Sequence, residues 1–155
     1  MFSAKHCAQR TGKIGEEKAC EFLKSKGYQI IKRNYQKPWG EIDIIAFTPD
    51  KTLVFFEVKT IRSRYAGSRE ARQFYDNWAD SLKPEDNLSQ AKLKKIRRSA
   101  QMFSAKHSDL ICEEKGWRID LLALTFRQNL GSILNESNGL TTNKEDCIIN
   151  HYQNI

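Results

Sequence analysis

The pattern of hydrophobic and polar positions is most regular between residues 40 and 59, where it predicts a β-hairpin. Two stretches rich in Ile, Val, Phe and Leu, 41–47 and 52–58, flank a short segment that contains Pro49 and Asp50. Because Pro and Asp favour turns, the two stretches are expected to pair as antiparallel strands. One face of this hairpin carries only apolar side chains and is the expected core face: Ile42, Ile44, Ala46, Val54, Phe56 and Val58.

The opposite face of the hairpin is apolar near the turn and charged at its open end, where Glu41 lies. A three-residue loop places Asp43 directly across from Glu57, and the period of two along a strand puts Lys59 on the same side. A loop one residue longer or shorter would send Asp43 to the other face. Charges beside an apolar surface are costly unless they are paired, bound to a metal or open to a cleft, so these residues are candidates for a site.

Residues 8–26 predict an amphipathic helix before the hairpin. Its apolar side carries Gly12, Ala19 and Leu23. Glu16 shares that side and is therefore expected to point toward the sheet; the alternative is a Glu at the edge of the stripe that reaches solvent or a basic partner. Gly12 and Gly15 on this side would let the helix approach the sheet closely.

Residues 88–106 predict a second helix whose outer side is strongly basic. Its apolar stripe contains Leu93, Ile96, Ala100 and Phe103. Lys92 borders this stripe, while Lys94, Arg97 and Arg98 face away from it. Basic residues of this kind are candidates for binding phosphate groups. The alternative is that they form only a solvated helix face, together with a charged loop that contains Arg62 and Arg64. The candidate nucleic-acid-binding residues are Lys92, Lys94, Arg97, Arg98, Arg62 and Arg64.

The remaining apolar stretches complete an α/β fold with the order αβββαβ, in which helices flank a mixed central sheet. A single domain spanning 1–155 is expected, with its core at about 8–126. The further expected elements are strands at 28–35, 117–126 and 146–152, a loop at 60–87 with a short helix around 69–79, and a polar loop at 127–144.

Composition narrows the class of protein. The chain has 155 residues, 39% of them hydrophobic, and a net charge of +7, which suits a polyanionic partner without identifying one. It contains no apolar run of membrane-spanning length and no secretory signal, so a cytoplasmic protein without a membrane partner is expected. The four scattered cysteines lack zinc-ligand spacing and are expected to be free thiols.

The charged end of the hairpin suggests hydrolysis of phosphodiester bonds. Asp43 and Glu57 on neighbouring strands could hold Mg²⁺ or Mn²⁺, which prefer oxygen ligands. Lys59 would orient or help to deprotonate a water molecule and stabilise developing negative charge, and Glu16 could add a metal ligand or a proton acceptor. The alternative is a structural salt-bridge cluster. Neither a nucleophilic triad nor a glycine-rich phosphate loop is present, and no small-molecule cofactor is expected.

Several ordered motifs give the chain a resemblance to the YraN-type family of small bacterial proteins. They are Gly12-x-x-Gly15-Glu16, GEID at 40–43, FFEVK at 55–59, and Arg118-Ile119-Asp120. The resemblance covers about residues 10–126, and the ending 148–152 is similar to the last strand of the family. That family is identified as a member of the restriction-endonuclease-like PD-(D/E)xK superfamily, similar to archaeal Holliday-junction resolvases.

The resemblance implies a restriction-endonuclease-like core. It also implies that Asp43, Glu57 and Lys59 take the metal-binding and catalytic positions, that Glu16 is the helical acid and that Lys92 is the lysine after the variable loop. The expected function is therefore a metal-dependent endonuclease acting on DNA, including branched or structured DNA, and a homodimer is expected if the resolvase analogy holds. The alternatives are a non-catalytic module that binds nucleic acid or protein, and a small enzyme that uses paired carboxylates on another substrate.

Overall fold

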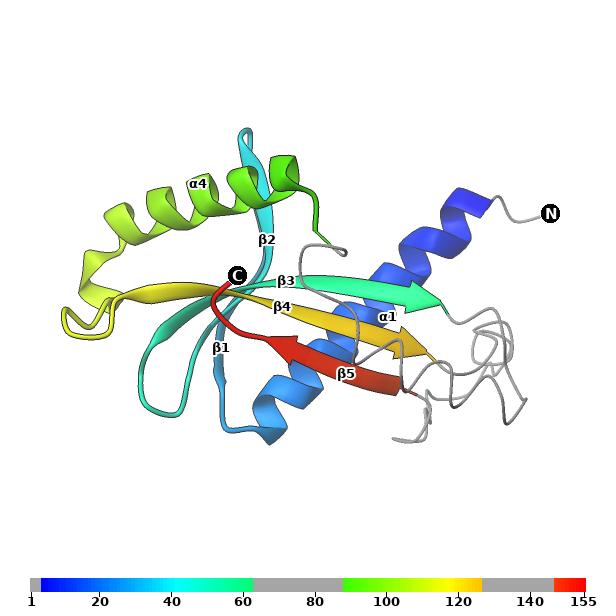
Figure 1. Cartoon of the computed structure of the whole chain (residues 1–155), viewed down its shortest axis with the longest axis horizontal. Coiled ribbons are helices and arrows are strands. Elements are labelled where there is room, and N and C mark those ends of the chain that lie inside the picture. Colours follow the sequence, from blue (N-terminus) through cyan, green and yellow to red (C-terminus); the bar gives the residue numbers. More distant parts are fainter. Residues whose placement is uncertain (1–3, 63–87, 127–146) are drawn as a thin grey trace.

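In the computed structural model the described residues are 4–62, 88–126 and 147–155, and they form a five-stranded mixed sheet between two helices (Figure 1). The strands follow one another in the sheet in sequence order; β3 and β4 are parallel and the other neighbours are antiparallel. This arrangement confirms the mixed α/β fold and the order αβββαβ. The elements are α1 (Ala4–Ser25), β1 (Gln29–Lys37), β2 (Gly40–Phe47), β3 (Leu53–Arg62), α4 (Gln90–Lys106), the 3-10 helix η1 (Ser108–Leu110), β4 (Trp117–Phe126) and β5 (Cys147–Tyr152).

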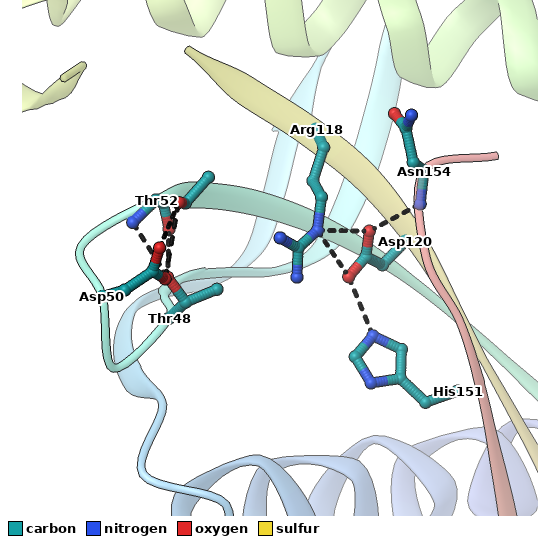
Figure 2. A network of polar contacts seen from close by, with 7 residues as sticks. All are labelled: Thr48, Asp50, Thr52, Arg118, Asp120, His151 and Asn154. Carbon is teal, nitrogen blue, oxygen red and sulfur yellow. Dashed lines mark hydrogen bonds and ion pairs between the residues drawn. The ribbon is translucent and has the colours of Figure 1, made fainter. Parts of the chain in front are cut away.

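The turn between β2 and β3 has the three-residue loop that the sequence predicts. The main-chain N–H of Thr48 donates to the carbonyl of Thr52 at 3.0 Å, and Lys51 inside the loop has a positive φ of 69°. The Thr48 hydroxyl also donates to the carboxylate of Asp50 (Figure 2). The same carboxylate accepts a second contact from Lys115 Nζ at 2.9 Å. This turn fixes the register of the hairpin, with Phe47 opposite Leu53, Ala46 opposite Val54, Ile45 opposite Phe55 and Ile44 opposite Phe56.

The two faces of the sheet carry separate hydrophobic clusters, one under each helix. Because successive residues of a strand point to opposite faces, both clusters draw on β2 and β3. The α1 cluster contains Ala19, Cys20, Leu23, Ile44, Ala46, Val54, Phe56, Leu122 and Leu124. The α4 cluster contains Tyr35, Ile42, Ile45, Leu53, Phe55, Leu88, Ile96, Ala100, Phe103 and Ile119.

Two glycines allow the helices to lie close to the sheet. A Cβ added at Gly15 of α1 would lie 2.0 Å from the hydroxyl oxygen of Thr60 on β3, and one added at Gly40 of β2 would lie 2.8 Å from that of Ser99 on α4. Neither approach could occur with a larger residue in place. Gly12, which shares the apolar side of α1 with Gly15, has no atom within 4 Å of such a Cβ.

The predicted sheet face of Ile42 was wrong. The alternation of the hairpin assigned Ile42 to the same face as Ile44, but Ile42 packs in the α4 cluster and Ile44 in the α1 cluster. The paired register of β2 and β3 ends at Ile44 and Phe56, and β2 continues beyond that point paired only with β1, so that strict alternation across the hairpin is lost.

Other predicted elements begin at slightly different residues in the structure or lie outside the described residues. The first helix begins at Ala4 rather than at residue 8, and α4 begins at Gln90, with the Ser89 hydroxyl accepting from the N–H of Lys92 as an N-cap. The predicted short helix at 69–79 and the polar loop at 127–144 lie outside the described residues. No helix in the described part of the chain is long and apolar enough to cross a membrane.

The cysteines for which the structure gives a state are free thiols: Cys20, Cys112 and Cys147. Burial raises the pKa of Cys147 to about 11, so this thiol is protonated at neutral pH.

Candidate functional site

The site begins where β2 separates from β3. At this point the N–H of Val58 on β3 donates to the carboxylate of Asp43 at 2.7 Å. A main-chain donor inside a fold needs a partner, and here the Asp43 side chain takes the place of a β2 carbonyl. The separation of the strands therefore directs Asp43 toward β3, next to Glu57, although these two residues are not a paired position of the ladder.

Asp43 and Glu57 are close enough to influence each other's ionisation. Glu57 is only 7% exposed, and its Oε2 is buried with no hydrogen-bond partner. Burial, followed by the negative charge of Asp43, raises the pKa of Glu57 to about 7. Burial also raises the pKa of Asp43 to about 6, despite the hydrogen bond from Val58, which acts in the opposite direction. Without a cation, two ionised carboxylates are thus costly at this position.

Lys92 of α4 supplies an ammonium that contacts the carboxylates of Glu41 and Glu57. Its Nζ lies 2.8 Å from Oε1 of Glu41 and 3.3 Å from Oε1 of Glu57. Partial burial lowers the pKa of Lys92, but the hydrogen bond to Glu41 and the charge of Glu57 outweigh it, so the pKa is raised overall. The sequence pattern places Glu41 at the charged end of the hairpin without giving it a role, because no periodicity in one segment shows which helix residue will reach it.

Glu16 and Lys59 stand at the margins of this cluster. The close contact between Gly15 and Thr60 brings α1 onto β3, and the charge of the half-buried Glu16 contributes to the raised pKa of Asp43. Lys59 follows Glu57 by two positions on β3, on the same face by alternation, and its side chain is exposed. Asp43 and Glu57 lie close enough for their charges to interact, although they are not the paired position that the three-residue loop predicts, and the ammonium in contact with Glu57 belongs to Lys92.

The donor set fits a divalent cation that keeps most of its water. Among the described residues, no three His, Cys, Asp or Glu side chains are grouped so that they could hold one ion, so Glu16 does not join Asp43 and Glu57 as a third ligand in this arrangement. Mg²⁺ is commonly bound through one or two carboxylates together with water and substrate phosphates. The unpartnered Oε2 of Glu57 and the raised pKa of both acids are the features that such an ion would satisfy.

The basic residues of α4 lie as their periodicity predicts. Ile96, Ala100 and Phe103 are buried against the sheet, whereas Lys94 and Arg98 are exposed on the other side of the helix. Arg97 is exposed as well, but its guanidinium donates to the main-chain oxygen of Ile155 at 3.4 Å. Arg62 is the last residue of β3, and Arg64 lies outside the described residues.

A second polar cluster surrounds Asp120 of β4 (Figure 2). Asp120 is fully buried; its carboxylate contacts Arg118 Nε at 3.0 Å and His151 Nε2 at 2.8 Å, and accepts from the N–H of Asn154 at 3.0 Å. Burial alone would raise the pKa of Asp120, but these three contacts lower it overall. The motif Arg118-Ile119-Asp120 noted in the sequence thus joins β4 to the C-terminal segment, a pairing that no local pattern could have shown.

Comparison with known proteins places these residues within a family. Residues 15–124 match the family described as "Uncharacterised protein family UPF0102". This range includes Glu16, Asp43, Glu57 and Lys92.

Individual relatives agree with this match. A UPF0102 protein of Campylobacter jejuni subsp. doylei is 35% identical over 108 residues, which cover 65% of this chain and 80% of the relative. One of Desulforamulus reducens is 34% identical over 122 residues, covering 79% of this chain and 85% of the relative. One of Sulfurihydrogenibium sp. is 33% identical over 117 residues, covering 76% and 85% respectively.

Proposed function

This chain belongs to family UPF0102, and we propose that it is a metal-dependent endonuclease that hydrolyses phosphodiester bonds in DNA. The observation that carries the proposal is the pair formed by the half-buried Asp43 and the buried Glu57, two carboxylates with raised pKa values, of which Glu57 has a buried oxygen without a partner. Ionised acids in such a position destabilise the fold, so stability alone does not explain their presence. Carboxylates with strongly perturbed pKa values cluster at functional sites.

Each residue of the site has a distinct part in this proposal. Asp43 and Glu57 hold Mg²⁺ or Mn²⁺, and Val58 fixes the orientation of Asp43 through its N–H. The bound ion supplies Lewis-acid polarisation of the phosphate and a more acidic water molecule. Lys59, which is exposed and follows Glu57 by two positions on β3, would orient the attacking water and stabilise negative charge as it develops. Glu16 remains a candidate proton acceptor.

The positive charge of the chain and of the outer side of α4 supports DNA as the substrate. The chain carries a net charge of +7, and Lys94 and Arg98 on the exposed side of α4 have the chemistry that phosphate contacts require. The similarity to Holliday-junction resolvases noted from the motifs extends the proposal to branched DNA, where cleavage of two strands would need two copies of the chain.

A second candidate function is a non-catalytic module that binds nucleic acid or protein. The contact of Lys92 with Glu57 favours it, because an ammonium at 3.3 Å already neutralises part of the charge that would otherwise attract a metal ion. Magnesium binding separates the two candidates.

The deciding experiment is cleavage of labelled DNA by the purified full chain. Duplex, single-stranded, flap and four-way-junction substrates are incubated with Mg²⁺, Mn²⁺ or EDTA. We expect products with either metal and none with EDTA. The variant Glu57→Gln should lose activity, whereas Glu114→Gln, which removes an exposed carboxylate on the loop before β4, should keep it. Metal-dependent cleavage that survives in Glu57→Gln would exclude this site.

A further inference from the structure

We propose that Lys92 competes with the divalent cation for Glu57, and that Glu41 holds the Lys92 ammonium beside the site once the ion is bound. This inference rests on the metal site of the proposed function and assigns Glu41 and Lys92 a positioning role in it. Lys92 would offset the negative charge of Glu57 in the metal-free protein. The affinity of the site for the ion would then depend on where the Lys92 ammonium is held.

The geometry that supports competition is the sharing of one ammonium between two carboxylates. Lys92 Nζ is nearer to Glu41, at 2.8 Å, than to Glu57, at 3.3 Å. The two acids differ in exposure, since the side chain of Glu41 is 51% exposed and that of Glu57 only 9%. An exposed carboxylate is solvated whether or not it is paired, whereas a buried one depends on its partner. Glu57 therefore gains most from a cation, and Glu41 can keep Lys92 at little cost.

The charge balance gives the direction of the effect. Asp43 is influenced by the negative charges of Glu16 and Glu41 as well as by the positive charge of Lys92, and Glu57 by those of Asp43, Glu41 and Lys92. Acids thus outnumber the ammonium, and a divalent cation is attracted. An ion bound to Glu57 would repel an ammonium at the present distance, so Lys92 must retreat toward Glu41 when the ion enters.

The retreat of Lys92 would link metal binding to the phosphate backbone. An ammonium displaced from Glu57 remains at the edge of the site, where it can donate hydrogen bonds to a phosphate group instead. Binding of a polyanion would then favour the arrangement that binds metal, and metal would favour the polyanion in the same measure.

The test is calorimetric titration of the metal-free full chain with Mn²⁺ in the absence of DNA. In Lys92→Met the aliphatic stem is kept and the charge removed, while the N-cap contact of residue 92 is made by its main chain. We expect this variant to bind Mn²⁺ about tenfold more tightly than the wild type, because the competing charge is gone. Lys106→Met, which removes an exposed ammonium from the last turn of the same helix, should bind as the wild type does. Equal or weaker binding by Lys92→Met, or the same gain in both variants, would overturn the proposal.

A double-mutant cycle tests the part assigned to Glu41. Glu41→Gln leaves Lys92 with Glu57 alone, so we expect weaker Mn²⁺ binding in the wild-type background and little change in the Lys92→Met background. An equal loss in both backgrounds would mean that Glu41 acts on the metal directly, contrary to the proposal.

These binding measurements are independent of catalysis. If Lys92→Met binds Mn²⁺ more tightly but no DNA is cleaved by the wild type, the competition stands and the nuclease proposal fails. If DNA is cleaved while Lys92→Met binds no more tightly, the reverse holds.

Discussion

The carboxylate of Asp43 accepts a hydrogen bond of 2.7 Å from the main-chain N–H of Val58, at the point where β2 has left β3. One side chain thereby satisfies the backbone of the neighbouring strand and becomes fixed beside Glu57. A substitution that keeps an acceptor oxygen, such as Asp43→Asn, should therefore preserve the local fold while removing the charge. This makes the site accessible to experiments that separate charge from structure.

The first prediction concerns stability and pH in the absence of metal. The pKa of Glu57 is raised to about 7 from 4.5, so the folded protein binds this proton more tightly than the unfolded chain does. The contribution of Glu57 to folding is therefore most favourable below its unfolded pKa and is lost as pH rises toward 7. Glu57→Gln should be more stable than the wild type at pH 8 by about 1–3 kcal/mol, and similar to it near pH 4. Urea unfolding at the two pH values measures this.

Bound metal should reverse the difference in stability between Glu57→Gln and the wild type. If millimolar Mg²⁺ stabilises the wild type but not Glu57→Gln, the carboxylate is a ligand. A wild-type melting temperature that does not respond to Mg²⁺ would support the non-catalytic alternative.

The second prediction concerns the approach of α1 to β3. Gly15→Ala would place a methyl group 2.0 Å from the Thr60 hydroxyl oxygen and should destabilise the protein by about 1–3 kcal/mol. Gly12→Ala is the matched control, because nothing lies within 4 Å of the added methyl group; it should stabilise the helix by about 0.5–1 kcal/mol. Thr60→Ala should relieve part of the destabilisation in Gly15→Ala. Thermal unfolding of these variants would contradict the prediction if the two glycine substitutions had the same effect.

The third prediction concerns Asp120. Its contacts with Arg118 and His151 lower its pKa overall, so its contribution to stability is present above the unfolded pKa of 3.8 and is lost as pH falls below that value. Asp120→Ala would leave Arg118 and His151 without their acidic partner and should cost about 3–5 kcal/mol. Asp109→Ala, at an exposed position in η1, is the control and should change little. Urea unfolding of both variants at pH 7 decides whether the cluster is structural.

The fourth prediction separates DNA affinity from chemistry. Lys94 and Arg98 are exposed on α4, so the double variant Lys94→Ala/Arg98→Ala should reduce the slope of log affinity against log salt by about 0.7–0.9 for each phosphate that the protein no longer neutralises. Lys92→Ala should affect cleavage more than this slope. Binding isotherms at several salt concentrations provide the comparison. An unchanged slope in the double variant would mean that this face of α4 is only a solvated surface.

Local patterns were sufficient to predict the hairpin and its register. Pro49 and Asp50 marked the turn, the three-residue loop set the pairing from Phe47–Leu53 to Ile44–Phe56, and helical periodicity separated Ile96 from Lys94. These features depend on residues that are close in sequence, and for this reason local patterns are enough to predict them.

Features that depend on the path of a strand through the sheet could not be predicted in this way. The predicted face of Ile42 was wrong because β2 separates from β3 beyond Ile44. Strand alternation contains no information about where the pairing of two strands stops. The position of Lys92 at the border of the helical stripe was visible in the sequence, but its contact with Glu57 was not, since only the packing of α4 on the sheet decides which acid this ammonium reaches.

The parallel pairing of β3 with β4 has a consequence for the order in which the molecule assembles. Leu53 pairs with Trp117 and Arg62 with Phe126, so this ladder closes a long stretch of chain that contains α4. Closing such a loop loses chain entropy before any contact rewards it, whereas the β2–β3 hairpin needs only a short one. The acids of the hairpin should therefore meet during folding before the helix that carries Lys92 has docked, and an early intermediate would hold these acids together without their ammonium. Divalent ions present during refolding would reduce the repulsion between these acids at the stage when Lys92 has not yet arrived.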